Sequence, residues 1–448
     1  MLKKMLSVLL CAVQILVAGS LMAGCGKREK QLVYFLNFKP ESAKTYEQIA
    51  KDYEKETGIR VKVVTAAANT YEQTLKSEVA KSQAPTIFQI NGPVGYQSWK
   101  DYCLDLRGSS VYSLLSDPSL AIRDGEKVVG VPYAVEGYGI LYNNEIMKRY
   151  FALPDRRSSL NDASQIRSFS ELKTVVEDMT AHKEQLGIEG VFGSTSLASG
   201  EDWRWQTHLA NVPFYEEFRE DAPSAETVVT ATNAKTVEFR YSEAFRSLFD
   251  LYTDNSVTQK TLLGSKSVED SMAEFALSRC AMIQNGTWAW SQIANVSGNT
   301  VSSDEVGMLP LYMGLPGEES MGLCIGTENY LAINARVSEE KQQASLDFLD
   351  WLFSSETGKR YVREELRFIT PFSSFADGEQ PTDPLSEQML SSMKNSDIHS
   401  IPWTFTGFPG EAFKKAFGSA LLEYVQGSLS FDEVKNTVIV QWERERNR

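Results

Sequence analysis

Polar side chains stand at the ends of two apolar, strand-length runs in this chain, where they could bind a polar small molecule. Asn37 and Lys39 follow one run, and Gln89 and Asn91 end another. Amide groups donate and accept hydrogen bonds, and an ammonium group donates them. Where such runs form a parallel sheet, their carboxyl ends meet at one edge, and ligands bind there. The sequence therefore predicts that these four side chains contact a ligand.

The elements that would position these residues alternate between strand and helix. Apolar or β-branched runs at 32–36, 59–64 and 87–90 predict strands. Apolar residues at helical spacing between them predict two helices, the first of which ends at Gly58. This β-α-β-α-β order with short connections indicates an α/β protein, with a mostly parallel sheet covered by helices on both faces.

The alternation continues through the rest of the chain. Ser170 is expected to cap a helix that runs to Lys183, and Gly187 is expected to stop it. The other predicted elements are strands on both sides of Glu136-Gly137, a strand over 190–196, and helices with one apolar face over 344–352 and 413–424.

Composition excludes several classes of function. The 448 residues are enough for two or three domains and carry a net charge of −14. Nucleic-acid binding needs clustered positive charge, so no nucleic-acid partner is expected. Three histidines argue against a His-rich metal site, and no metal or other cofactor is expected. Motifs of phosphate-binding loops, zinc proteases and serine hydrolases are absent.

Residues 1–24 have the features of a secretion signal, with two lysines before an apolar stretch and small residues at its end. Residues 21–25 (LMAGC) resemble the lipobox of bacterial lipoproteins, with Met22 where leucine is usual. The resemblance implies cleavage before Cys25 and a lipid on that cysteine, with residues 25–30 as a tether. The alternative is an ordinary signal peptide with a chance cysteine.

Cleavage would leave three further cysteines, Cys103, Cys280 and Cys324. Their number is odd, and no C-x-x-C spacing occurs among them. We expect buried thiols that behave as small apolar groups, and one disulfide is the alternative. Removing two lysines and no acid would also bring the net charge to −16.

An ordered set of motifs extends over nearly the whole mature chain. They lie at 53–61 (YEKETGIRV), 84–88 (APTIF), 130–137 (GVPYAVEG), 281–290 (AMIQNGTWAW) and 348–358 (FLDWLFSSETG). Together they resemble the carbohydrate-binding, maltose-binding-protein-like family of bacterial extracellular solute-binding proteins of ABC importers. That family usually has Asp where Thr86 stands. The resemblance implies a type II periplasmic-binding-protein fold, in which two α/β lobes are joined by hinge crossovers and enclose a ligand cleft.

The resemblance also implies that both lobes are discontinuous in sequence. The first lobe would comprise residues 30–136 and 327–372, and the second would comprise residues 138–322 and 373–448. The chain would cross between them at Glu136-Gly137, at 322–327 and near 372–377.

A carbohydrate site needs flat rings for the apolar faces of sugars and planar polar groups for their hydroxyls. The resemblance implies that Trp203 and Trp288 stack against the sugar and that Glu136 is a hinge carboxylate in contact with it. Further predicted contacts are Trp403 in the 401–410 loop, Asn329 just past the second crossover and Asp397 before that loop. Trp205 and Trp290 would be supporting or core residues, and Trp351 a core residue.

The sequence thus predicts a lipid-anchored protein on the extracellular or periplasmic face of the cell membrane. It would capture a short oligosaccharide by hinge closure and perform no catalysis. The implied partners are an ABC permease and its ATPase, with a monomeric chain that meets the membrane only through its lipid. The alternatives are an exported carbohydrate-active enzyme, or the same fold binding a peptide or a polyamine. The acids available to a polyamine are Glu136, Glu201, Asp202 and Glu328, whereas an enzyme would use two cleft carboxylates such as Glu136 and Glu328.

Overall fold

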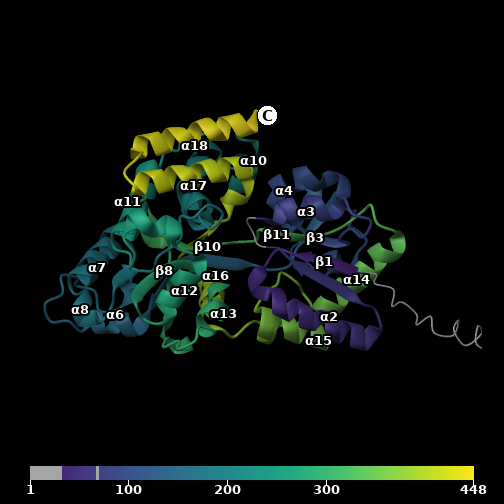
Figure 1. The fold of residues 1–448 in the computed structure, drawn as a ribbon, viewed down its shortest axis with the longest axis horizontal. Helices are drawn as coiled ribbons and strands as arrows, with labels where there is room; N and C mark the ends of the chain where they lie inside the picture. Colours follow the sequence, from purple (N-terminus) through teal and green to yellow (C-terminus); the bar gives the residue numbers. More distant parts are fainter. Residues whose placement is uncertain (1–32, 67–69, 448) are drawn as a thin grey trace, which may run out of the picture.

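The computed structural model describes residues 33–66 and 70–447. Its helices and strands form two units side by side, each built on one β-sheet (Figure 1). We call the unit on the sheet of β1 the first lobe and the unit on the sheet of β6 the second lobe. The predicted signal segment 1–24, Cys25 and the 25–30 tether lie outside the described residues.

The first sheet has its strands in the order β2-β1-β3-β11-β5-β4. These strands are β1 (Val33–Asn37), β2 (Val61–Thr65), β3 (Ile87–Asn91), β4 (Ile122–Asp124), β5 (Lys127–Pro132) and β11 (Asn329–Ile333). β1 pairs in parallel with β2 and β3, and helices α2 (Ala43–Thr57) and α3 (Tyr71–Val79) connect them. The predicted β-α-β-α-β unit is therefore confirmed, with Gly58 at the end of α2.

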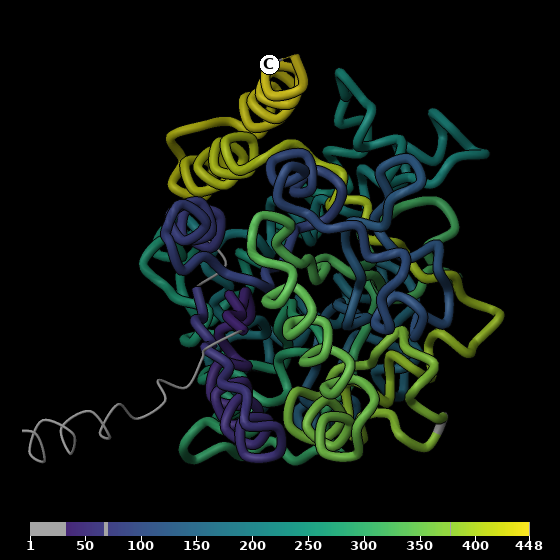
Figure 2. Tube along the Cα trace, turned by 90° about the vertical axis from the view of Figure 1, so that its right-hand side faces the viewer, coloured from purple at the N-terminus to yellow at the C-terminus, as the bar shows by residue number. Residues whose placement is uncertain are grey.

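Late segments of the chain complete the first lobe. β11 pairs antiparallel with both β3 and β5. Helix α14 (Glu339–Ser354) packs against α2, where the rings of Tyr53 and Phe348 lie 5.1 Å apart between centroids. Figure 2 shows these early and late segments next to each other. The first lobe therefore needs the return of the chain after residue 326 to complete its core.

The second sheet has the order β12-β10-β6-β8-β7, and β9 also pairs with β6. Its strands are β6 (Glu136–Asn143), β7 (Gly190–Phe192), β8 (Cys280–Gly286), β9 (Val306–Leu309), β10 (Met321–Gly326) and β12 (His399–Pro402). Every residue of β8 is buried, because this strand lies inside the sheet with helices packed over it. β10 pairs with β6 at Glu136, so the two strands that lead into the crossovers lie next to each other.

Helices cover both sheets. The longer ones in the second lobe are α6 (Asn144–Phe151), α7 (Phe169–Ala181), α9 (Ala210–Asp221), α11 (Ser242–Asp254), α12 (Val268–Ala276), α16 (Pro384–Lys394), α17 (Glu411–Val425) and α18 (Phe431–Arg446). The remaining ones are α4 (Gly92–Trp99), α5 (Ser110–Ser113), α8 (Lys183–Leu186), α10 (Thr227–Asn233), α13 (Ala289–Ala294) and α15 (Glu356–Arg360). Within the described ranges, none of them combines the length and apolar character needed to cross a bilayer.

Some local predictions differ from the structure. Ser168 rather than Ser170 caps α7, because its hydroxyl accepts a hydrogen bond from the backbone N–H of Glu171. Glu136 and Gly137 begin strand β6 instead of separating two strands, since Glu136 pairs with Gly326. The strand expected over 190–196 is shorter and ends at Phe192.

The three cysteines of the described chain are free thiols. Cys280 and Cys324 are buried, as predicted, whereas Cys103 is half-buried. Burial raises the pKa of the Cys324 thiol to about 12, which keeps it protonated and unreactive.

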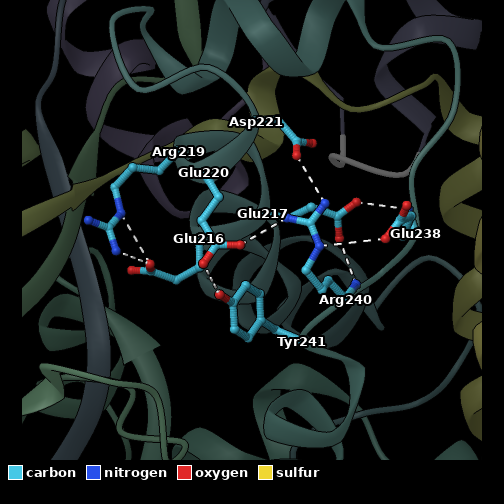
Figure 3. Close-up of polar contacts among 8 residues, drawn as sticks. All are labelled: Glu216, Glu217, Arg219, Glu220, Asp221, Glu238, Arg240 and Tyr241. Carbon is cyan, nitrogen blue, oxygen red and sulfur yellow. Dashed lines mark hydrogen bonds and ion pairs between the residues drawn. The ribbon is translucent and has the colours of Figure 1, made fainter.

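A charged network fixes the chain after α9 (Figure 3). Glu217 is buried, and its carboxylate accepts hydrogen bonds from the backbone N–H groups of Glu238 (2.8 Å) and Arg240 (2.7 Å). The guanidinium of Arg240 also pairs with acids at the end of α9, namely Glu220 and Asp221. Phe239, between the two anchored residues, is buried and has a left-handed backbone with φ +49°. The network therefore holds a backbone conformation that phenylalanine rarely adopts.

We predict that Glu217→Gln lowers the free energy of unfolding by about 1–3 kcal/mol, because one buried backbone N–H then faces an amide donor. Urea denaturation measures this change. Glu238→Gln is the control, since the side chain of Glu238 is 75% exposed. Replacing this exposed carboxylate should change the free energy of unfolding by no more than about 0.5 kcal/mol. Equal effects of the two substitutions would contradict the role of Glu217.

Candidate ligand-binding cleft

A buried ion pair joins the lobes where the chain first crosses between them. Lys39 follows β1, and its Nζ lies 2.8 and 2.9 Å from the carboxylate oxygens of Glu136, the first residue of β6. Burial alone would lower the pKa of Lys39, but the carboxylates of Glu136 and Glu41 outweigh it and raise that pKa. Lys39 therefore stays protonated, and the pair compensates its own charges away from water.

Asn37 and Gln89 direct their side chains into the loop that carries Lys39. Asn37 donates from Nδ2 to the carbonyl of Lys39 (2.7 Å) and accepts at Oδ1 from its N–H (3.1 Å). Gln89 accepts from the N–H of Phe38 and donates to the hydroxyl of Tyr133. Both residues are almost fully buried. In this structure they therefore shape the loop and position Lys39.

Asn91 and Asn329 lie opposite each other on β3 and β11. Asn91 donates from Nδ2 to Glu328 Oε1 at 2.8 Å. Burial raises the pKa of Glu328, and the charge of Lys414 and the hydrogen bond from Asn91 only partly oppose it. Asn329 is 4% exposed, and its Oδ1 has no hydrogen-bond partner. Asn329 does not line the cavity described below.

The three tryptophans predicted to contact a ligand meet in one aromatic cluster of the second lobe. Ring centroids of Trp288 lie 6.1 Å from Trp203 and 6.4 Å from Trp403. Trp403 packs on the backbone of Gly326, where an added Cβ would lie 2.5 Å from the ring. Glycine is therefore required at this end of β10. The other members of the cluster are Tyr138, His208 and Phe405.

A cavity of about 300 Å³, which we call the cleft, lies beside this cluster. Its walls come from both lobes: Glu41 and Arg367 from the first, Trp288 and Gln292 from the second, and Glu136 at the crossover. This volume is at the lower end of the range for small-molecule sites. The cleft therefore combines a large aromatic ring with charged and amide groups.

Asp397 lies apart from the other predicted contacts. β12 runs parallel to β10, with His399 opposite Met321 and Pro402 opposite Ile325. Gly326, the last residue of β10, pairs with Glu136 at the first crossover. Trp403 directly follows β12 and therefore lies at this end of the second sheet. Asp397 lies beyond the opposite end and is exposed. The direction of this short strand therefore separates it from the cleft.

Three further tryptophans considered from the sequence lie outside the aromatic cluster. Trp205 is fully buried and donates from its indole nitrogen to the carbonyl of Ser196 at 3.0 Å. Trp290 is buried among residues of α12 and α13. Trp351 is half-buried rather than buried, because its indole nitrogen reaches Glu56 at 2.8 Å on the surface of the first lobe.

Sequence reasoning missed most of the residues that line the cleft, among them Glu41 and Gln292, and several that surround the tryptophans. Tyr138 and His208 belong to the aromatic cluster, with their rings 4.3 Å apart. Arg204 stacks on the ring of Trp203 at 4.0 Å, and Arg367 lines the cleft. In the sequence, Tyr138 lies two residues after the predicted contact Glu136, and Arg204 directly follows Trp203. This proximity could have identified both residues. No local pattern distinguishes His208 or Arg367.

A family model described as "Bacterial extracellular solute-binding protein" matches residues 48–387. The chain belongs to this family. The recognition made from the ordered motifs is thereby confirmed. A search of curated proteins found no matching sequence.

Solved structures similar to this solute-binding protein confirm the two-lobed α/β fold. A chitin oligosaccharide binding protein has a TM-score of 0.73 at 16% identity, over 93% of this chain and 99% of that one. The solute-binding protein RafE in complex with raffinose has a TM-score of 0.66 at 19% identity, over 92% and 99%. A Bacillus licheniformis sugar transporter in complex with stachyose has a TM-score of 0.67 at 16% identity, over 92% and 100%.

The buried imidazole of His208 makes stability depend on pH. Burial, and then the charge of Arg204, lowers the pKa of His208 well below its usual 6.5. Below pH 6.5 the unfolded chain therefore binds a proton here that the folded protein does not. The free energy of unfolding should fall on acidification, by up to about 1.4 kcal/mol per pH unit from this group.

We predict that His208→Phe makes the loss of stability between pH 7 and pH 5 shallower than in the wild type. Urea denaturation at several pH values measures the slope. His182→Gln is the opposite control: the backbone carbonyl of Asp178, helped by neighbouring carboxylates, raises the pKa of His182. Protonated His182 stabilises the folded protein at low pH, and this stabilisation is lost as the pH rises. His182→Gln should therefore make the loss of stability on acidification steeper. Parallel slopes in wild type and His208→Phe would contradict a buried neutral His208.

Proposed function

We propose that this solute-binding protein captures a carbohydrate, in the form of a short oligosaccharide, in the cleft. The meeting of Trp203, Trp288 and Trp403 beside a polar cavity carries the proposal. Sugars present apolar faces that rings cover and hydroxyls that planar polar groups bind. Similar folds solved with raffinose and stachyose support the same ligand class.

Polar side chains that line the cavity supply the groups that hydroxyls need. They include the amides of Gln292 and Asn295, the hydroxyls of Thr287 and Ser291, and the carboxylate of Glu136. A sugar hydroxyl both donates and accepts, so it can pair with each of these groups.

Hinge closure is part of the proposal. The lobes would comprise residues 30–136 with 327–372 and residues 138–322 with 373–448, with Glu136 at the first crossover. A ligand that contacts both lobes only when they meet favours the closed state by that difference in contacts. The lobes touch in this structure at Gly92 of α4 and Thr406 of the turn after β12, where an added Cβ on Gly92 would lie 3.0 Å from Thr406 Cβ.

Delivery would follow from the same closure. We infer that a permease with its ATPase recognises the closed protein, that a lipid on Cys25 anchors the monomeric chain, and that no catalysis occurs. The LMAGC run at 21–25 supports the anchor. Both carboxylate oxygens of Glu136 are held by Lys39, which supports binding over general acid–base catalysis.

We predict that one sugar series raises the melting temperature of the soluble form starting at Gly26, because binding to the folded state stabilises it by about 2.7 kcal/mol at a hundredfold excess over Kd. A thermal-shift screen of mono- to tetrasaccharides, peptides and polyamines measures this. Trp203→Ala and Trp288→Ala should abolish the shift. Trp351→Ala, on the surface of α14, should keep it. A salt-sensitive shift with a polyamine and none with sugars would overturn the ligand class.

We predict that Gly92→Ala weakens binding of the sugar found in that screen about tenfold. The added Cβ would crowd Thr406 where the lobes touch, and a cost of about 1.4 kcal/mol to the closed state corresponds to a tenfold loss of affinity. Calorimetry gives the affinity. Gly125→Ala is the matched control, because Gly125 also has a positive φ but no atom within 4 Å of its added Cβ. Both variants carry backbone strain, whereas only Gly92→Ala should lose affinity. Equal affinities would show that this contact does not form in the bound state.

A further inference from the structure

One helix of the second lobe presents a polar face to the cleft. Trp288, Ser291, Gln292 and Asn295 line the cavity, and they follow one another at helical spacing along α13 and its two end residues. Ile293, on the other face, is buried among apolar side chains. With a rise of about 1.5 Å per residue, the seven steps from Trp288 to Asn295 span about 10 Å. This face is therefore longer than one pyranose ring.

The amides on this face are available to a ligand. The side chains of Gln292 and Asn295 make no hydrogen bond to any other described residue, whereas the hydroxyl of Ser291 donates to the carbonyl of Trp288 at 3.3 Å. An amide group both donates and accepts hydrogen bonds, as a sugar hydroxyl does. Both amides can therefore bind hydroxyls of a ligand that lies along α13.

The first lobe contributes a strained stretch of backbone to the cleft. Residue Arg367 ends the π-helix Tyr361–Leu366 with φ +57°. The N–H groups of Arg367 and Phe368 both donate to the carbonyl of Val362 and hold this turn. Of the non-glycine residues with positive φ in the described chain, only Arg367 lines the cavity. Both π-helices and strained residues are concentrated at functional sites.

The guanidinium of Arg367 has unused donors. Its Nη1 is buried without a hydrogen-bond partner, and it forms no ion pair with any described residue. Glu364 and Glu365 also line the cavity, but they pair with Arg363 and Arg360. The carboxylates in the lining disfavour an anion, whereas a neutral hydroxyl can accept from a guanidinium. This free donor therefore matches a sugar hydroxyl.

The wall of the cleft in the second lobe begins at the first crossover. Thr287 donates from its backbone N–H to the carbonyl of Gly137 at 2.9 Å. The ring of the next residue, Trp288, packs against the backbone of Gly286 and is half-buried. α13 leads away from this point, so its two amides lie farther from the crossover than the ring of Trp288.

The wall in the first lobe begins at the same place. The ammonium of Lys39, which holds Glu136, lies 5.8 Å from the ring centroid of Phe368. Arg367 directly precedes Phe368 in the chain and therefore stands at the crossover end of the cleft, as Trp288 does.

We propose that the cleft holds two neighbouring units of one sugar chain. The first unit lies on the ring of Trp288, and its hydroxyls accept hydrogen bonds from the guanidinium of Arg367 in the other lobe. The second unit lies farther along α13, where the amides of Gln292 and Asn295 bind its hydroxyls. The inference rests on the proposed function and assigns the residues that select its ligand.

Chain length separates the two positions. Calorimetry compares the monosaccharide and the disaccharide of every sugar series that raises the melting temperature. Wild-type protein should bind the disaccharide at least tenfold more tightly. Gln292→Ala should remove most of this gain and change the affinity for the monosaccharide by no more than about twofold, and Asn295→Ala repeats the test. Gln343→Ala, at an exposed glutamine of α14 outside the cleft, is the matched control and should keep both affinities.

Arg367→Gly tests the first position. Glycine adopts a positive φ without strain, so the ligand-free variant should melt at the same temperature as wild type or higher. It should nevertheless bind the monosaccharide and the disaccharide at least tenfold more weakly, because the donor is lost. Arg363→Gln, outside the lining, should keep both affinities. An arginine with only a structural role would change the melting temperature and leave the affinities unchanged.

The outcomes distinguish this inference from the proposed function. Equal affinities of wild type for the monosaccharide and the disaccharide, or an equal loss of both in Gln292→Ala, would overturn the second position and leave carbohydrate binding standing. Wild-type affinities in Arg367→Gly would overturn the role of the strained turn. No binding of any sugar would overturn both proposals.

Discussion

The buried pair of Lys39 and Glu136 fixes the point where the chain first crosses between the two lobes. It joins the loop after β1 to the first residue of β6, at the point where the chain first leaves one sheet for the other. Removing one partner from such a pair leaves a buried charge, which typically costs about 3–5 kcal/mol. Asn37 and Gln89 use their own hydrogen bonds to hold the loop that carries Lys39. The polar ends of β1 and β3 thus support the crossover.

The strands next to this pair bring the aromatic cluster together. β10 pairs with β6 at Glu136 and Tyr138, and β8 pairs with β6 at Tyr138 and ends at Gly286, two residues before Trp288. β12 runs parallel to β10 and places Trp403 at the same end of the second sheet as Gly286 and Glu136. Residues from well-separated parts of the sequence therefore share one edge of the second sheet because of strand order and direction.

Charge is distributed unevenly across the cleft. Its lining holds four carboxylates and one guanidinium, which are Glu41, Glu136, Glu364, Glu365 and Arg367, and Glu136 is paired with Lys39. Burial lowers the pKa of Arg204 to about 10, yet the group remains a cation at neutral pH. Arg204 does not line the cavity itself, because it is 2% exposed and stacks on Trp203 behind it.

The sequence by itself determined the class of fold, the family and most of the elements. Periodicity located β1, β2 and β3 with their helices, and the ordered motifs led to the solute-binding family, because local propensity and patterning act over short stretches. It also selected Trp203, Trp288 and Trp403, which the structure brings into one cluster.

Tertiary structure alone decided the roles of the polar residues. The parallel direction of β12 moved Asp397 away from Trp403, although the two are close in sequence. Packing gave the amides of Asn37 and Gln89 partners inside the protein and left Arg204 without an acid. Whether a polar group is satisfied depends on which distant segments meet it in space, and no local pattern in a sequence encodes that.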